Sequence, residues 1–228
     1  MPNVDDIYQK TGRPKKGYYT SDGKRVPGVT TICKHIDPSA DGLIFWAIGL
    51  ERQGLDWKEV RDQSAREGTA VHDAVGHVCD GFSIEDATAA FPPEQQASVA
   101  AGLKAFMAWR EQSRINLKPY EKPLVSDELR FGGTADLLGR DADGRLHLAD
   151  IKTGSLRAAA VLQVAAYKHL IERALDEVVA GCHLLRFDRA EGAFTHIGIP
   201  DDVMDAAWEG FISAQSLYEL NKRLRKML

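Results

Sequence analysis

The chain contains 228 residues, of which 44% are hydrophobic and 27% are charged, a composition that supports a folded core and excludes a disordered chain. Its formal net charge of −4 excludes a protein that is basic over its whole surface, as many nucleic-acid-binding proteins are. Three widely spaced cysteines exclude a disulfide framework and a C-x-x-C metal site.

The N-terminal half is predicted to be a hairpin followed by helices. Two short extended runs flank a Ser-Asp-Gly turn in Tyr18–Val26, the pattern of a hairpin. The helices are recognised by apolar residues at helical spacing. Their starts are marked by an acidic residue, a Ser-x-x-Asp pattern or a proline, and one end is marked by a glycine. They are expected at Val29–Lys34, Asp41–Arg52, Asp56–Asp80, from Ser83 onward, and from Pro93 to about Arg114.

The second half is predicted to be mainly strands. Its short apolar runs are separated by Gly132-Gly133 and by Asp141–Gly144, both of which indicate turns. Strands are expected at Tyr120–Val125, Glu128–Phe131, Thr134–Gly139, Arg145–Lys152, Val178–Phe187 and Ala193–Ile199, and helices at Arg157–Ala174 and from Asp201. We expect one α+β domain spanning 1–228, with an N-terminal arm (1–35), a helical region (36–118), a sheet core (119–200) and a C-terminal helix (201–228).

Positive charge is concentrated at the two ends of the sequence. Residues 1–35 have a net charge of +4 and residues 219–228 a net charge of +3, which leaves −11 for 36–218. Basic ends on an acidic body suit arms that bind phosphate and an interior that binds metal. Solvated termini of no special function explain the same pattern, and the hairpin at Tyr18–Val26 is open to both interpretations.

The pattern D-x-K occurs three times, and its third occurrence has the most informative context. In Asp150-Ile151-Lys152, at the end of a predicted strand, the two charged side chains point to one side and Ile151 points to the core. Asp136 lies on the preceding predicted strand, which a tight turn joins to the strand of Asp150. The two acids can therefore come within reach of one hard cation. A structural ion pair with Lys152 explains the same residues.

Two further groups of polar residues lie on predicted helices. Gln163 and Tyr167 are four residues apart and share one face. His72 lies on an apolar face, and the small residues Gly68 and Thr69 allow another element to approach the helix closely there. A hydrogen-bonded core histidine and a buried Gln–Tyr tether are the simpler interpretations.

Taken together, these residues resemble the PD-(D/E)xK nuclease superfamily, specifically its RecB-like exonuclease branch with phage-type and mitochondrial-type members. Four short motifs occur in the family's order, and the run V-P-G-V-T-T-I before Trp46 is similar to the start of such proteins. The motifs are G-T-x-x-H (Gly68–His72), G-G-T-A-D (Gly132–Asp136), D-I-K-T-G (Asp150–Gly154) and Q-x-x-x-Y (Gln163–Tyr167).

The resemblance implies a fold, a site and a cofactor. The fold would be restriction-endonuclease-like, with a central mixed β-sheet flanked by helices, and the cofactor one or two Mg²⁺ or Mn²⁺ ions, without an iron–sulfur cluster. Asp136, Asp150 and Lys152 would be catalytic. The metal ligands would be His72, Asp136, Asp150 and the backbone carbonyl of Ile151; Gln163, Tyr167 and Thr153 would bind substrate, and Glu121 falls where many relatives place another acid.

The expected function is therefore metal-dependent exonuclease activity on linear single- or double-stranded DNA, in recombination, repair or replication. A recombinase or a single-strand-binding protein is the expected kind of partner, and the oligomeric state stays open. A structure-specific endonuclease or nickase, or an inactive DNA-binding module, are the alternatives. The longest stretch without charged residues, Ala158–Tyr167, is about half of the roughly 20 apolar residues that cross a bilayer. The first residues lack a signal peptide's apolar core, so the expected location is the cytoplasm, or the host cytoplasm for a phage protein.

Overall fold

A computed structural model describes residues 14, 17–36, 40–188 and 191–228. Residues 1–13, 15 and 16 of the arm expected at 1–35 therefore lie outside the described residues. Within the described part, no helix is both long and apolar enough to span a membrane.

The centre of the fold is a mixed five-stranded sheet in the order β3-β6-β7-β8-β9. Its strands are β3 (Asn116–Pro119), β6 (Leu137–Arg140), β7 (Leu146–Lys152), β8 (Val179–Phe187) and β9 (Phe194–Ile199). Strands β7 and β8 are parallel, and the other neighbouring strands are antiparallel. Helix α7 (Ala158–Leu175) makes the crossover that a parallel pair requires. The predicted α+β fold with a central mixed sheet is confirmed.

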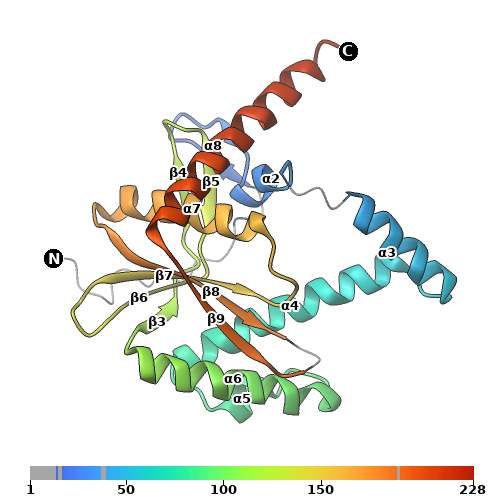
Figure 1. Cartoon of the computed structure of the whole chain (residues 1–228), viewed down its shortest axis with the longest axis vertical. Coiled ribbons are helices and arrows are strands. Elements are labelled where there is room, and N and C mark those ends of the chain that lie inside the picture. The colour runs from blue at the N-terminus through green and yellow to red at the C-terminus, as the bar shows by residue number, and fades with distance from the viewer. Residues whose placement is uncertain (1–13, 15–16, 37–39, 189–190) are drawn as a thin grey trace.

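Helices cover both faces of this sheet (Figure 1). One face packs against α7 and α8 (Asp201–Leu224), and the other against α4 (Trp57–Cys79), α5 (Ile84–Thr88) and α6 (Pro93–Ser113). Strand β7 is buried on both sides, because Leu146 and Leu148 belong to the first core while Ala149 and Ile151 belong to the second. A strand that is covered on both faces needs apolar residues at nearly every position, so a charged residue within it has a special role.

A smaller layer lies beside the sheet. Strands β4 (Pro123–Ser126) and β5 (Phe131–Thr134) form one hairpin, and β1 (Tyr18–Tyr19) and β2 (Arg25–Val26) form another. The backbone N–H of Gly132 donates to the Pro27 carbonyl at 3.0 Å, which joins the two hairpins. Helices α2 (Val29–Cys33) and α3 (Ala40–Arg52) follow, and α3 extends away from the sheet (Figure 1).

The helices occur in the predicted order, and local interactions determine where they begin and end. The Asp56 side chain accepts the Lys58 N–H at the start of α4, and the Ser83 side chain accepts the Asp86 N–H at the start of α5. Arg114 ends α6 in the left-handed conformation with φ of 55°. The strongest sequence signals, helical spacing with a cap, were therefore interpreted correctly.

The predicted strands between 116 and 139 were partly wrong. Strand β3 was missed, and the strand expected at Glu128–Phe131 is a turn up to Arg130, whose φ is +58°. The strand expected at Thr134–Gly139 is interrupted at Ala135 and Asp136, between β5 and β6. There the backbone instead pairs with the segment after β3, since the Tyr120 N–H donates to the Asp136 carbonyl at 2.9 Å.

The prediction that Gly132-Gly133 is a turn was also wrong, because both glycines lie inside β5. A Cβ atom on Gly132 would lie 2.5 Å from Tyr18 Cγ, and one on Gly133 would lie 2.6 Å from Tyr167 Cε1. Since side chains alternate along a strand, the two glycines open opposite faces of β5 to two aromatic rings.

Candidate active site

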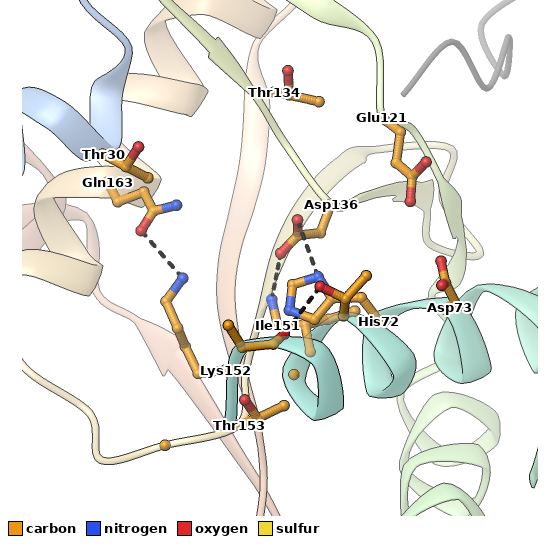
Figure 2. Close-up of a pocket in the computed structure, with 14 residues that line it drawn as sticks. Thr30, His72, Asp73, Glu121, Thr134, Asp136, Ile151, Lys152, Thr153 and Gln163 are labelled. Carbon is orange, nitrogen blue, oxygen red and sulfur yellow. Dashed lines mark hydrogen bonds and ion pairs between the residues drawn. The ribbon is translucent and has the colours of Figure 1, made fainter. Parts of the chain in front are cut away.

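A pocket of about 570 Å³ opens where β7 ends beside α4 and the break between β5 and β6. Figure 2 shows Lys152 and Gln163 on one side of it, Asp136 and His72 in the middle, and Glu121 on the other side. Seven of the predicted site residues line this pocket: His72, Glu121, Asp136, Ile151, Lys152, Thr153 and Gln163. Two others, Asp150 and Tyr167, are buried directly behind its wall.

Asp136 owes its position to the break between β5 and β6. Its Oδ2 accepts the Ile151 backbone N–H at 2.9 Å, and its Oδ1 lies 3.5 Å from His72 Nδ1. Burial favours the neutral acid, but His72, Lys152 and the Ile151 N–H together outweigh it and hold the pKa of Asp136 well below its usual range. Asp136 is therefore a buried, ionised carboxylate at the centre of the pocket.

Asp150 lies within β7 and has no solvent exposure. Its Oδ2 forms an ion pair with Lys152 Nζ, whereas its Oδ1 accepts no hydrogen bond from any residue that the structure describes. Burial raises the pKa of Asp150, the nearby Lys152 ammonium opposes this, and the negative charge of Asp136 adds to it. A buried carboxylate oxygen without a partner is costly, so this position needs a cation.

Lys152 is held by a short chain of side chains from α7. Its Nζ donates to Gln163 Oε1 at 3.2 Å, and Gln163 Nε2 donates to the Tyr167 hydroxyl at 2.7 Å. Because Gln163 and Tyr167 lie one helical turn apart, they point in the same direction. Tyr167 is 3% exposed, and its hydroxyl contacts Gln163, which lines the pocket.

Small residues allow these elements to approach one another. A Cβ on Gly68 would lie 3.1 Å from Thr153 Oγ1, so α4 and the end of β7 are close there, as the sequence predicted. Tyr18, packed over Gly132, hydrogen-bonds through its hydroxyl to Thr134 Oγ1 at 2.9 Å. The N-terminal hairpin thus fixes a threonine that lines the pocket.

The sequence interpretation missed three pocket residues: Thr30, Asp73 and the hydroxyl of Thr134. Asp73 follows His72 on α4, where it lies four residues after Thr69 and so close to the same face. The spacing of four residues from Thr69 is the sequence signal by which Asp73 could have been found. Thr30 comes from α2, and no spacing in the sequence relates α2 to this pocket.

The donor groups of the pocket suit a divalent cation. Carboxylate oxygens are the preferred ligands of Mg²⁺ and Mn²⁺, and an imidazole is accepted by Mn²⁺. His72 and Asp136 are adjacent, and the unpartnered Oδ1 of Asp150 supplies a second carboxylate. In the part of the chain that the structure describes, no three His, Cys, Asp or Glu side chains converge on one point, and Lys152 forms an ion pair with Asp150. The donor groups of the pocket are therefore chemically suited to a divalent cation, and Lys152 lies beside Asp150.

Comparison with known proteins gives one match that covers most of the chain. The model of a family described as the PD-(D/E)XK nuclease superfamily matches residues 49–213, which include all the pocket residues from His72 to Gln163. No curated protein matches this chain.

Solved structures show only weak likeness. The crystal structure of SSO0001 is 13% identical, with a TM-score of 0.29, over 64% of this chain and 73% of that one. The crystal structure of LHK-Exo in complex with dAMP is 12% identical, with a TM-score of 0.31, over 71% of this chain and 95% of that one. These similarities are too weak to assign a substrate.

Proposed function

This chain belongs to the PD-(D/E)XK nuclease superfamily, and on that basis we propose that it is a divalent-metal-dependent exonuclease acting on linear DNA. Family membership supports a metal-dependent nuclease. The observation that carries the proposal for this chain is the pocket itself, which gathers an ionised Asp136, a lysine and a histidine beside a buried Asp150 whose Oδ1 accepts no hydrogen bond from the described residues. Such an arrangement suits phosphodiester hydrolysis, and we place the reaction in DNA recombination, repair or replication.

In this proposal, Asp136, Asp150, His72 and the Ile151 carbonyl hold Mg²⁺ or Mn²⁺. When bound, the ion polarises the phosphate and lowers the pKa of a nucleophilic water. The Ile151 N–H fixes Asp136 Oδ2, which leaves Oδ1 directed at His72 and the pocket. The backbone of β7 therefore sets the orientation of a side chain on the neighbouring segment.

Lys152 has a different role from the carboxylates. Its ammonium reaches the pocket between Asp150 and Gln163, where it offsets the negative charge that develops on the phosphate oxygens. Gln163, steadied by Tyr167, keeps the lysine in place. Thr153 and Gln163 line the pocket and are the proposed contacts to the DNA backbone, and Glu121 is a further acid at its edge.

The sequence motifs are the reason to propose exonuclease rather than endonuclease activity. Gly68–His72 and Gln163–Tyr167 both resemble the RecB-like exonuclease branch, and both now contribute to a single pocket. Substrate form is the property that distinguishes the two activities, because an exonuclease needs an end and an endonuclease does not.

The test is a gel assay with end-labelled linear single- and double-stranded DNA and a closed circle, in Mg²⁺, Mn²⁺ or EDTA. We expect metal-dependent loss of linear DNA, survival of the circle, and no cleavage by Lys152→Ala. Lys104→Ala, which removes an exposed lysine from α6, is the matched control and should cut like the wild type. Cleavage of the circle would show that the activity is that of an endonuclease and not of an exonuclease. Intact DNA in every lane would overturn the proposal.

A calorimetric titration with Mn²⁺ separates the proposed roles of the two neighbouring residues. Asp150→Asn should lose metal binding, because the substitution removes the charge that the ion needs. Lys152→Ala should retain metal binding while losing turnover. Equal loss of metal affinity in both variants would contradict these roles, and circular dichroism shows whether each variant is folded.

A further inference from the structure

A further groove lies at the end of α8, and cationic side chains stand along it. Its volume is about 240 Å³, and we call it the α8 groove. It is lined by His35, Tyr218, Asn221, Lys222, Arg225 and Lys226. The last 15 residues of the chain, 214–228, and His35 lie outside the family match, so the match does not cover the lining of this groove.

The groove is formed by one face of a helix. Tyr218, Asn221, Lys222 and Arg225 follow the spacing i, i+3, i+4, i+7, so their side chains share one stripe. The stripe faces the segment after α2, where the rings of His35 and Tyr218 have centroids 5.3 Å apart. Figure 1 shows this end of α8 passing α2 and extending beyond the body of the fold.

Positive charge on this surface is largely uncompensated. Lys222 lies 3.7 Å from Glu219, a weak contact at the surface. Lys34, Arg225 and Lys226 form no ion pair with any residue that the structure describes. The acidic remainder of the chain makes this basic surface the favourable place for an extended anion.

A small pocket of about 190 Å³ adjoins the catalytic pocket. It shares Thr30, Lys152 and Gln163 with the catalytic pocket, and it adds the cations Lys34 and Arg157. Lys34 directly precedes His35, which lines the α8 groove, so the two sets of lining residues are neighbours in the chain, although no residue that the structure describes lines both. Cations therefore occur at the catalytic pocket, at the small pocket and in the α8 groove.

From these cations we infer that the α8 groove binds the sugar–phosphate backbone of the DNA strand whose end lies in the catalytic pocket. The inference rests on the proposed nuclease function and adds the course of the substrate outside the site. Residues 218–226 span about 12 Å along the helix axis at about 1.5 Å per residue. That length corresponds to the axial rise of between three and four nucleotides of B-DNA, at about 3.4 Å each.

The test is the salt dependence of DNA binding. The variant Lys222→Gln/Arg225→Gln/Lys226→Gln removes three charges from the groove, and each phosphate contact contributes about 0.7 to 0.9 to the slope of log K against log salt. We expect the slope to fall by roughly 2 and Kd at low salt to rise by about tenfold or more. In the cleavage assay, the loss should appear as a higher KM for DNA.

A matched control removes the same charge from another groove. Lys104→Gln/Arg110→Gln/Arg114→Gln alters a groove of about 640 Å³ on α6, and its slope should stay close to that of the wild type. The probe is a fluorescent linear DNA of 30 nucleotides, used in EDTA for binding and in Mn²⁺ for cleavage.

The outcomes separate this inference from the nuclease proposal. A selective loss of slope in the groove variant supports the inference. If the wild type binds with this slope but does not cut, the nuclease proposal fails and the DNA-binding groove stands. If the wild type cuts and the groove variant binds like it, or both triple variants lose the same slope, the inference is wrong and the cations serve another acidic partner. Absence of DNA binding by the wild type overturns both.

Discussion

A row of three histidines crosses the sheet on the face covered by α6, and it predicts how stability depends on pH. His147 Nε2 lies 3.2 Å from Asp141 Oδ2, and His147 Nδ1 lies 3.0 Å from His183 Nε2. His183 Nδ1 lies 2.9 Å from His196 Nε2. The ring of His196 packs on Trp109 with centroids 4.5 Å apart.

The carboxylate at one end determines the proton positions along the row. Asp141 is ionised, with its pKa lowered to about 2, because hydrogen bonds from the Arg145 backbone, His147 and the Arg145 side chain outweigh the effect of burial. It can only accept, so His147 donates from Nε2 and, when neutral, accepts at Nδ1. His183 and His196 then follow in the same tautomer, and the row is satisfied with no extra proton.

His183, in the middle of the row, should therefore stay neutral in the folded state. Burial, followed by the charges of His196 and His147, lowers the pKa of His183 to about 4, from an ordinary value of 6.5. The unfolded chain binds a proton at His183 between these two values and the folded chain does not, so stability falls as the pH falls through this window. Between pH 7.5 and pH 4.5, the difference amounts to about 2.5 kcal/mol at 1.36 kcal/mol per pH unit.

The assay is urea unfolding of the wild type and His183→Gln at pH 7.5, 6.0 and 4.5. Glutamine retains a donor and an acceptor but does not titrate, so His183→Gln should lose about 2.5 kcal/mol less than the wild type over this range. Asp150, whose raised pKa acts in the opposite direction, is present in both proteins and cancels in the comparison. His77→Gln, at an exposed position on α4, is the control and should behave like the wild type. Parallel pH profiles for the wild type and His183→Gln would refute the reasoning.

Three further substitutions test individual contacts of the fold, each measured by urea or thermal unfolding. Gly132→Ala should destabilise the protein by about 1 to 3 kcal/mol, because the added Cβ would lie 2.5 Å from the Tyr18 ring. Tyr18→Ala in the same chain should reduce this cost. Fully additive effects of the two substitutions would contradict this explanation. Tyr18→Phe removes the hydrogen bond to Thr134 and should cost about 1 kcal/mol. Arg140→Gln breaks a two-point contact with Glu177 that is partly exposed, so the loss should stay below about 1 kcal/mol, and a larger one would show a buried role.

The sequence was sufficient for the helices because their signals are local. Asp56 caps α4, Pro92 and Pro93 mark the start of α6, and apolar residues repeat at helical spacing in both. Each of these features depends on residues within a few positions of one another. The strands around Gly132 and Gly133 were harder, because glycines are common in turns and also occur where a ring packs against a strand. Only the fold shows that Tyr18 and Tyr167, more than 100 and more than 30 residues away, occupy those faces.

For the candidate site, the sequence correctly predicted which side chains share a face but not how they contact one another. The alternation along β7 places Asp150 and Lys152 on one side of the strand, as expected. Nothing in the alternation shows that Lys152 lies over Asp150, because that depends on Gln163, which α7 places beside the lysine after the crossover. The consequence is chemical: the lysine neutralises a carboxylate that is otherwise costly to bury, and Gln163 gives it a second contact beside the pocket. The same pair of contacts that makes the buried aspartate tolerable therefore also keeps the ammonium beside the place where a phosphate would lie.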